Sequence, residues 1–354
     1  MSEGQTVSAI ADGADRIDAG ILEYRSAPVL VSAMRYDLRG FPPFAPAYRR
    51  ITHGLVAFAQ ALSQVMTIAD TATLLRLDWD TVKDLVKERL EVKFGRPDLR
   101  SLRRLSIDEI YVGRKGRFYT LVIDLESGRI VWVAPGRSGE SLAPFWRQLR
   151  LYKAKIEAVC CDLSAAYWKS VRENLPQAAV VFDRFHLVKL MNEKLDLLRR
   201  EMWREATGPM KANVKGTRYL LLTRRDQLGE DQLPRLDDAL RANQPLFIGY
   251  LLKEMLGLLW TQRNRVAMEN FLRYWCLTAA QTGIRSLQSI AKTFASHSTG
   301  ILSWWEYPIN NGRMEGINNK VKTLLRRHYG LRDERFLQLR LLGLHEAKFS
   351  LSGC

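Results

Sequence analysis

The chain has 354 residues, of which 47% are hydrophobic and 26% are charged. This composition excludes a disordered protein and allows two or three folded domains. Its 54 Lys and Arg residues outnumber its 38 Asp and Glu residues, so the formal net charge is +16. Such an excess predicts an acidic partner, for which DNA or RNA is favoured and a ribosomal or membrane surface is the alternative.

The cysteine pattern and the hydropathy exclude two further classes. The four cysteines form no Cys-x-x-Cys pair and no zinc-type spacing, so we expect reduced thiols at Cys160, Cys161, Cys276 and Cys354. No segment reaches the roughly 18 apolar residues that a membrane helix requires. The first residues also lack the pattern of a signal peptide. We therefore expect a cytoplasmic, nucleoid-associated protein with no membrane partner.

The beginning of the chain divides into an unassigned segment and a short helical domain. Residues 1–47 show no periodic pattern and end in a proline-rich linker. Residues 48–98 show helical periodicity, with Thr67 as a predicted N-cap, Asp70 in the capping-box position and a further helix beginning after Asp78. Two short helices joined by a tight turn fit a helix-turn-helix DNA-binding domain, and an ordinary helical hairpin is the alternative.

The segment 100–205 has the pattern of a mixed α/β domain. An initial meander of three β-rich runs is followed by alternating helical and β-rich runs. In chain order we predict strands at 105–112, 118–124 and 129–134, a helix at 139–149, a strand at 156–161, a helix at 164–174 and a strand at 178–182. This order predicts an α/β fold of the RNase H-like type, a mixed sheet with helices packed on it.

Two carboxylates occupy strand positions in this domain. Asp108 lies inside the first strand and Asp162 follows the fourth, so adjacent strand ends would bring them together. A charge in a buried strand is costly unless it is neutralised, which a divalent metal ion can do. Glu109 is next to Asp108, but consecutive strand residues face opposite sides, so only one of them can line the site. Asp162 can also cap the helix that begins near Ser164.

The rest of the chain predicts an all-helical insertion at 206–305 and a final segment at 306–354 that completes the domain. Glu315 lies at the start of a basic helix in this final segment. Polar and basic residues follow it at helical spacing and share its helix face, namely Asn319, Lys322 and Arg326. The apolar residues of the same helix are expected to face the core.

Four motifs in this order resemble one known family. They are Ser106-Ile-Asp-Glu109, Cys161-Asp-Leu-Ser-Ala-Ala-Tyr167, Phe182-Asp-Arg-Phe-His-Leu-Val188 and Asn311-Gly-Arg-Met-Glu-Gly-Ile-Asn-Asn-Lys320. With the upstream helices, they resemble the Asp-Asp-Glu transposase domain of the ISL-three insertion-sequence family from about residue 50 to about residue 345. The resemblance implies an RNase H-like core, a helical insertion before the glutamate, and cutting and joining of DNA at transposon ends.

The resemblance also implies roles for the three carboxylates. Asp108, Asp162 and Glu315 are the expected catalytic residues and the expected ligands of two Mg2+ ions, for which Mn2+ can substitute. Two such ions, roughly 3.5–4 Å apart, activate water and bind the leaving 3′ oxygen, and magnesium prefers carboxylate oxygens. The expected partners are DNA, as transposon ends and target, and further copies of the chain in a homodimer or higher homo-oligomer.

Further residues are candidates for supporting this reaction. Asp183 and His186 are expected behind the metal ligands, with a structural histidine as the alternative. Trp304 and Trp305 are possible base-stacking residues, with core packing as the alternative. The candidate DNA-binding residues are Asn311, Arg313, Asn319, Lys320, Lys322, Arg326 and Arg327 in the final helix, and Lys83 and Lys87 in the helix-turn-helix.

Two other functions are compatible with the sequence. Relatives in the ISL-three family usually begin with a cysteine-rich zinc-binding segment, whereas no cysteine precedes Cys160 in this chain. This departure is expected of a truncated copy and leaves open a catalytically inactive DNA-binding remnant or repressor. An RNase H-like, structure-specific nuclease, which cuts DNA without joining it, is the enzymatic alternative.

Overall fold

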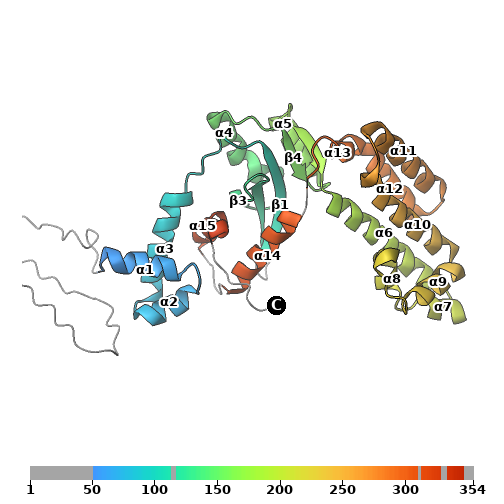
Figure 1. The fold of residues 1–354 in the computed structure, drawn as a ribbon, viewed down its shortest axis with the longest axis horizontal. Helices are drawn as coiled ribbons and strands as arrows, with labels where there is room; N and C mark the ends of the chain where they lie inside the picture. Colours follow the sequence, from blue (N-terminus) through green and yellow to red (C-terminus); the bar gives the residue numbers. More distant parts are fainter. Residues whose placement is uncertain (1–50, 113–116, 310–311, 328–332, 347–354) are drawn as a thin grey trace, which may run out of the picture. The chain divides into compact units, whose positions relative to one another are not determined.

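The computed structural model describes residues 51–112, 117–309, 312–327 and 333–346, without the side chains of 209–210, 312–315 and 327. The chain folds into two compact units (Figure 1). In the described residues, the first unit holds 51–96, 333–339 and 346, and the second holds 97–326 and 340–345. No described helix is long and apolar enough to cross a membrane.

A five-stranded sheet forms the centre of the second unit. Its strands are β1 (Arg104–Val112), β2 (Arg117–Asp124), β3 (Ile130–Pro135), β4 (Ala158–Cys161) and β5 (Ala179–Phe182), in the spatial order β3-β2-β1-β4-β5. β1, β2 and β3 pair antiparallel, whereas β4 pairs parallel with both β1 and β5. The five predicted strands and the predicted RNase H-like mixed sheet are confirmed.

Two helices cover one face of the sheet. They are α4 (Ala143–Tyr152), which follows the short 3-10 turn η1 (Gly139–Leu142), and α5 (Ala165–Asn174). Trp146 of α4 is buried and donates a hydrogen bond from Nε1 to Ser170 Oγ of α5 at 2.9 Å, which ties the helices together. Their apolar residues share one core with the strand residues Leu105, Ile107, Val159 and Cys161.

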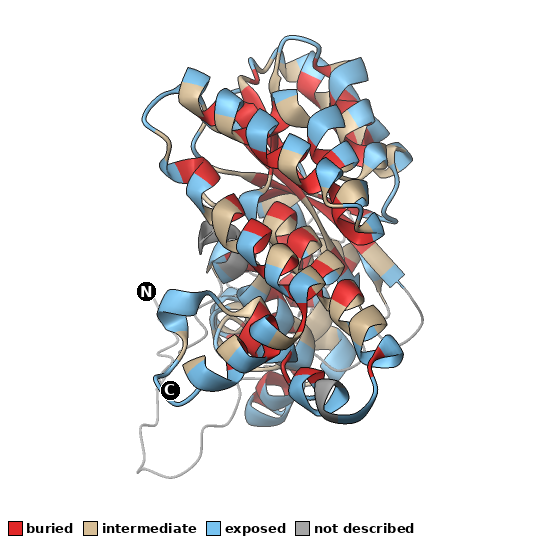
Figure 2. Cartoon of the chain, turned by 90° about the vertical axis from the view of Figure 1, so that its right-hand side faces the viewer, coloured by how far each residue is buried: buried red, intermediate tan, exposed pale blue. Residues whose placement is uncertain are grey.

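Helices alone connect β5 to the final helix of the second unit within its described residues, as predicted for the insertion. The long α6 (Arg184–Glu205) leaves the sheet and is followed by α7 (Gly208–Val214), α8 (Arg218–Leu222), α9 (Leu233–Ala242), α10 (Gln244–Gly257), α11 (Arg265–Gln281), α12 (Arg285–Ser296) and α13 (Ser298–Leu302). Figure 2 shows their buried residues on the sides that face neighbouring helices. The insertion returns to the sheet at α13, where Gly300 packs closely against the Phe182 ring of β5.

The helix α14 (Gly312–Arg327) is the basic helix predicted to carry Glu315. Its apolar residues Ile317, Val321 and Leu324 are buried, whereas Asn319, Lys322 and Arg326 are exposed. The predicted orientation of the helix is therefore confirmed.

The first unit contains the predicted helical domain, with α1 (His53–Leu62), α2 (Ile68–Leu75) and α3 (Trp79–Phe94). Thr67 caps α2 as predicted, because its Oγ1 accepts a hydrogen bond from the backbone N–H of Asp70 at 3.0 Å. Asp78 is the N-cap residue of α3 but makes no capping hydrogen bond with its side chain. The turn between α2 and α3 is tight and places Arg76 in the left-handed region with φ 52°.

The start of α15 (Glu334–Leu342) completes the core of the first unit. Phe336 is 1% exposed and packs with Ile68, Ala72, Val82 and Val86 of α2 and α3. Asp333 precedes this helix and caps it, because its Oδ1 accepts a hydrogen bond from Phe336 N at 3.0 Å. Lys87 Nζ of α3 lies 2.7 Å from Asp333 Oδ2, and Lys83 Nζ lies 3.5 Å from the same oxygen.

These contacts change the pKa of Asp333. Its partial burial alone would raise the pKa, but the hydrogen bonds from Lys87 and Phe336 N and the charges of Lys87 and Lys83 lower it to about 2. Since the pKa of Asp333 in the folded state lies below the ordinary pKa of an aspartate, the charged carboxylate stabilises the unit at neutral pH.

We predict that Asp333→Asn lowers the local stability of α15 by about 1 kcal/mol at pH 7, because it removes a partly buried ion pair. The difference in stability between the variant and the wild type should shrink as the pH falls toward about 2, the pKa of Asp333, because the wild-type carboxylate then becomes protonated. Hydrogen exchange of the α15 amides in the full chain measures this stability. Asp84→Asn, at an exposed position of α3, is the control and should leave α15 unchanged at every pH.

Candidate active site

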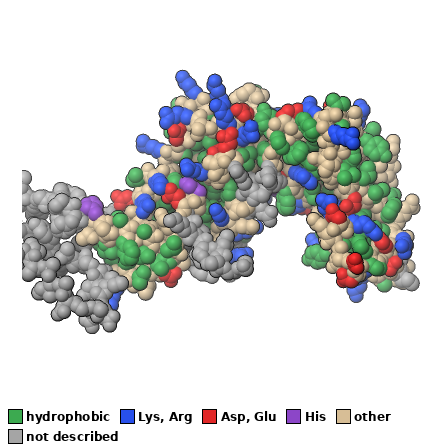
Figure 3. All heavy atoms as spheres, viewed as in Figure 1, with side chains coloured by type: hydrophobic (Ala, Val, Ile, Leu, Met, Phe, Trp, Pro, Cys, Tyr) green, Lys and Arg blue, Asp and Glu red, His purple; other side chains and the backbone are tan. Residues whose placement is uncertain are grey.

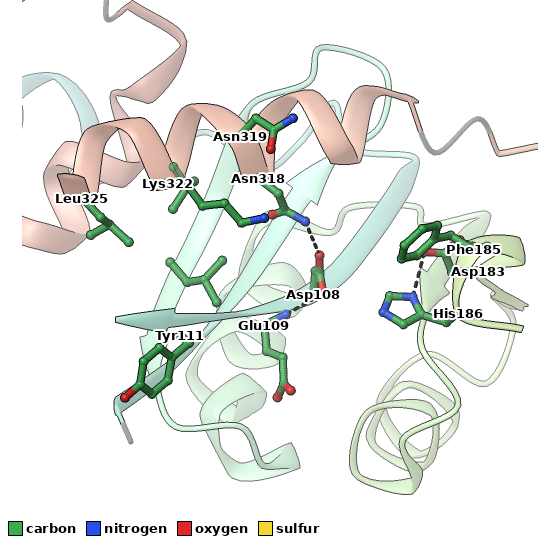
Figure 4. A pocket seen from close by; sticks show the side chains of 12 residues that line it. Asp108, Glu109, Tyr111, Asp183, Phe185, His186, Asn318, Asn319, Lys322 and Leu325 are labelled. Atoms are coloured by element: carbon green, nitrogen blue, oxygen red, sulfur yellow. Dashed lines mark hydrogen bonds and ion pairs between the residues drawn. The ribbon is translucent and has the colours of Figure 1, made fainter. Parts of the chain in front are cut away.

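The parallel pairing of β1 with β4 brings the two predicted aspartates together. Ser106 pairs with Cys160 in this ladder. Asp108 lies two residues further along β1, and Asp162 directly follows the last residue of β4. The two carboxylates lie close enough for the charge of Asp108 to raise the pKa of Asp162. Figure 4 shows Asp108 directed toward α14 and Glu109 directed away from it, as the alternation predicts. Both residues nevertheless line the same pocket, so the prediction that only one of them can line the site is not confirmed.

Asp108 is fixed by two hydrogen bonds. Its Oδ1 accepts from the backbone N–H of Glu109 at 2.8 Å, and its Oδ2 accepts from Nδ2 of Asn318 on α14 at 2.8 Å. Asn318 was not among the predicted site residues, although it follows Glu315 by three positions and so lies on the same side of the helix. Its Oδ1 is buried and has no hydrogen-bond partner among the described residues.

Asp108 and Asn318 lie in a pocket of about 520 Å3 between β1, the start of α6 and α14. Acidic, aromatic and basic side chains contribute to its lining. The lining residues are Asp108, Glu109, Ile110, Tyr111, Asp183, Phe185, His186, Asn318, Asn319, Val321, Lys322 and Leu325. In Figure 4, Asp183, Phe185 and His186 stand on one side of Asp108, and Asn318 and Lys322 of α14 stand above it.

Negative charge is concentrated in and around this pocket. Burial raises the pKa of Asp162, and the charges of Asp108 and Asp183 raise it further, against the lowering effects of Ser164 N–H and His186. Ser164 N donates to Asp162 Oδ1 at 2.9 Å, so the predicted capping contact of Asp162 is present. Burial and the charges of Asp162 and Asp108 likewise raise the pKa of Glu109. Such a cluster favours a bound cation, because the cation relieves the repulsion between carboxylates.

Asp183 and His186 form a hydrogen-bonded pair at the start of α6. His186 Nδ1 lies 2.8 Å from Asp183 Oδ2, while Asp183 Oδ1 accepts a hydrogen bond from Phe185 N at 2.8 Å and caps the helix. The hydrogen bond that His186 donates to Asp183 raises the pKa of His186, and the charges of Asp183, Asp108 and Asp162 add to this effect against the lowering effect of burial. The pair therefore places a proton-binding ring beside the carboxylates.

The described donor set fits a hard metal ion. Asp108 and Asp162 supply carboxylate oxygens, and the unpartnered Oδ1 of Asn318 supplies an amide oxygen beside Asp108. Oxygen ligands of this kind suit Mg2+. The described side chains include no group of three His, Cys, Asp or Glu residues arranged to hold an ion. Glu315 lies in α14, but its side chain is outside the described residues.

The predicted DNA-binding residues fall into three groups. Asn319, Lys320, Lys322 and Arg326 are exposed on α14, and Lys322 and Asn319 line the pocket. Asn311 and the side chains of Arg313 and Arg327 lie outside the described residues. Lys83 and Lys87 are engaged with Asp333 inside the first unit, and their DNA-binding role stays a prediction.

The two tryptophans predicted as possible base-stacking residues do not line the pocket. Trp304 is partly buried against the core of the second unit, and its Nε1 is buried without a partner among the described residues. Trp305 is 36% exposed. Phe185, which the motif analysis passed over, lines the pocket and is 61% exposed.

Comparison with known proteins agrees with this architecture. A family model described as a transposase matches residues 105–341, and a model described as the helix-turn-helix domain of transposase family ISL3 matches residues 42–90. The transposase for insertion sequence element IS1001 of Bordetella parapertussis is 34% identical over 298 residues, which cover 83% of this chain and 73% of that protein. The transposase for element IS1557 of Mycobacterium tuberculosis is 29% identical over 291 residues. This match covers 75% of this chain and 65% of that protein.

A solved structure, the Drosophila P element transposase strand transfer complex, aligns with a TM-score of 0.42 and 11% sequence identity, covering 83% of this chain and 92% of that chain. The sequence matches include both the sheet with its acidic pocket and the α1–α3 domain. The chain therefore belongs to the ISL3 family of insertion-sequence transposases.

Proposed function

We propose that the protein is a magnesium-dependent DNA transposase that cuts the ends of its element and joins the 3′ ends to target DNA. The observation that carries this proposal is the proximity of Asp108, on β1, to Asp162, which directly follows the neighbouring strand β4. Asp108 is also hydrogen-bonded to the helix that contains Glu315. In family terms these are the acids of an Asp-Asp-Glu site. Two divalent ions held there would activate the attacking oxygen and stabilise the leaving 3′ oxygen.

The residues of the chain would position the reacting strand around these acids. Asn318 holds the Asp108 carboxylate in one orientation through its Nδ2 hydrogen bond. Lys322 lines the same pocket and offers a cation to a phosphate that faces the acids. His186, held by Asp183, can accept or release a proton beside Asp162.

The distribution of positive charge supports DNA as the partner. Exposed Lys322 and Arg326 extend along α14 from the pocket, so phosphates on both sides of the cleaved bond could be held. Lys and Arg side chains gather at the top of the view in Figure 3, where Figure 1 shows α4. This helix carries the exposed residues Arg147 and Arg150. The helix-turn-helix would bind the element ends, and two chains would act together because two ends are joined.

The proposed function is tested with labelled DNA that carries the terminal repeats of the element encoding the chain, incubated with the protein and Mg2+. We expect cleaved and joined products with the wild-type protein. Asp162→Ala should lower both by on the order of 100-fold or more, because stabilisation by bound metal contributes several kcal/mol. Asp238→Ala, at an exposed carboxylate of α9, is the matched control and should retain full activity.

Each other outcome identifies a different function. Cleavage without joining would make the protein a nuclease, and binding without cleavage would make it a DNA-binding remnant or repressor. Full activity of Asp162→Ala would refute the assignment of the metal site.

A second prediction concerns Asn318. Asn318→Ala should lower the cleavage rate by about 10- to 100-fold and raise the Mg2+ concentration required for half-maximal cleavage, because Asp108 loses its orienting partner. Titration of Mg2+ in the cleavage assay measures both effects. The control Asn270→Ala changes an exposed asparagine of α11 and should leave the Mg2+ requirement unchanged, so an equal shift in both variants would contradict the role of Asn318.

A third prediction concerns the basic face of α14. Replacing Lys322 and Arg326 together by Ala should weaken duplex DNA binding and reduce the slope of log K against log salt concentration by about 2, because two phosphate contacts are lost. Fluorescence anisotropy at several salt concentrations measures the slope. The control replaces Arg285 and Lys292, two exposed cations of α12, and should not alter it. An unchanged slope in the α14 variant would show that this face does not contact phosphates.

A further inference from the structure

Phe185 is an exposed aromatic side chain next to the ionisable residues Asp183 and His186. It is 61% exposed, although its apolar ring would be stabilised by burial. It lines the pocket that contains Asp108, and it lies between Asp183 and His186 in sequence. Nothing in the core of the second unit depends on its ring, since Phe185 is absent from the buried cluster and from the residues packed against it.

The structure holds Phe185 in a defined position despite this exposure. Its backbone N–H donates to Asp183 Oδ1 at 2.8 Å, which fixes it in the first turn of a 22-residue helix. Its ring packs edge-to-face on the His186 ring, with centroids 5.7 Å apart and an interplanar angle of 86°. His186 is itself held by Asp183. An aromatic ring that is both exposed and fixed loses little conformational entropy when a ligand packs on it.

The pocket around Phe185 has the chemistry of a nucleotide site. Carboxylates lie at its floor, Lys322 supplies a cation, and Asn318 and Asn319 supply amide groups. Tyr111 adds a second aromatic side chain, which packs against Phe118. The volume of about 520 Å3 is within the roughly 300–1,000 Å3 typical of pockets for small organic ligands. The pocket could therefore hold one nucleotide, with its phosphate near Lys322 and its base near Phe185.

We propose that Phe185 is a stacking platform for one base of the DNA strand being cut, a base that leaves the duplex stack next to the reacting phosphate. This inference deepens the proposed function and rests on it, because it requires DNA to enter the pocket. The site accepts an unpaired or mismatched nucleotide with any base, since every base offers a π face. The base-stacking role predicted for Trp304 and Trp305 is thereby transferred to a residue beside the acids.

A base accounts for Phe185 better than an apolar protein segment does. The pocket around the ring is amphipathic, because the charged residues Asp108, Asp183 and Lys322 line it together with the apolar residues Ile110, Val321 and Leu325. An apolar segment would remove water from these charged groups and offer no anion to Lys322, which is costly. A nucleotide presents an aromatic face to the ring and a phosphate to Lys322, so it matches both parts of the pocket.

The test compares two 30-base-pair duplexes, one fully matched and one with two adjacent mismatches at its centre, in buffer with EDTA. Mismatched bases leave the stack at lower cost. Wild-type protein should therefore bind the mismatched duplex about 10-fold more tightly, and Phe185→Ala should reduce this preference to about 2-fold or less. Phe185→Trp should keep it, because the larger ring still stacks. Fluorescence anisotropy gives each Kd, with Phe247→Ala, a half-exposed phenylalanine of α10, as the control.

The outcomes separate stacking from a structural role. If Phe185→Ala keeps the wild-type preference, or if wild type shows none, the stacking platform is refuted. Equal weakening for both duplexes by Phe185→Ala and by Phe185→Trp would indicate a structural role and would also refute it. Binding in EDTA does not require cleavage, so a protein that cuts no DNA in Mg2+ would overturn the proposed function while leaving the preference for mismatched DNA measurable.

Discussion

The parallel pairing of β1 with β4 is the constraint on which the candidate site depends. The backbone ladder, with Ser106 opposite Cys160, holds the segment that carries Asp108 beside the segment that leads to Asp162. Two neighbouring carboxylates repel each other, and burial raises the pKa of Asp162 further. The buried strands around them, with Val159 and Leu105 fully inaccessible, provide the stability that holds this unfavourable arrangement in place. The fold thus holds carboxylates close together, an arrangement that a bound cation would stabilise.

The second element of the site is supplied by a distant part of the chain. α14 is anchored by its buried residues Val321 and Leu324, and it reaches Asp108 through Asn318. The same helix presents Lys322 and Arg326 outward. One amphipathic helix therefore combines two features, because one side of it holds an amide against the Asp108 carboxylate while its exposed side presents two cations. A rotation of this helix by one residue would disrupt both.

The strands could be predicted from the pattern of β-rich runs, and the two aspartates from the local motifs that contain them. The exposed face of α14 could be predicted from the helical spacing of its polar residues. Asn318 was missed because +3 and +4 positions both face the same side of a helix, and only the packing angle decides which one reaches the sheet. The contacts of Lys83 and Lys87 with Asp333 could not be predicted, since they join residues far apart in the chain. Phe185 was missed because exposure of a single phenylalanine leaves no periodic signal.

The helix α6 connects the pocket mechanically to the insertion. It begins at Asp183, with Phe185 and His186 in its first turn, and it runs for 22 residues, about 33 Å, without a break. Its later residues Leu195 and Leu198 belong to the core of the insertion, where Gly249 of α10 packs closely against them. Because one continuous helix carries both groups of residues, we expect a displacement of the insertion along α6 to shift Phe185 and the Asp183–His186 pair beside the carboxylates.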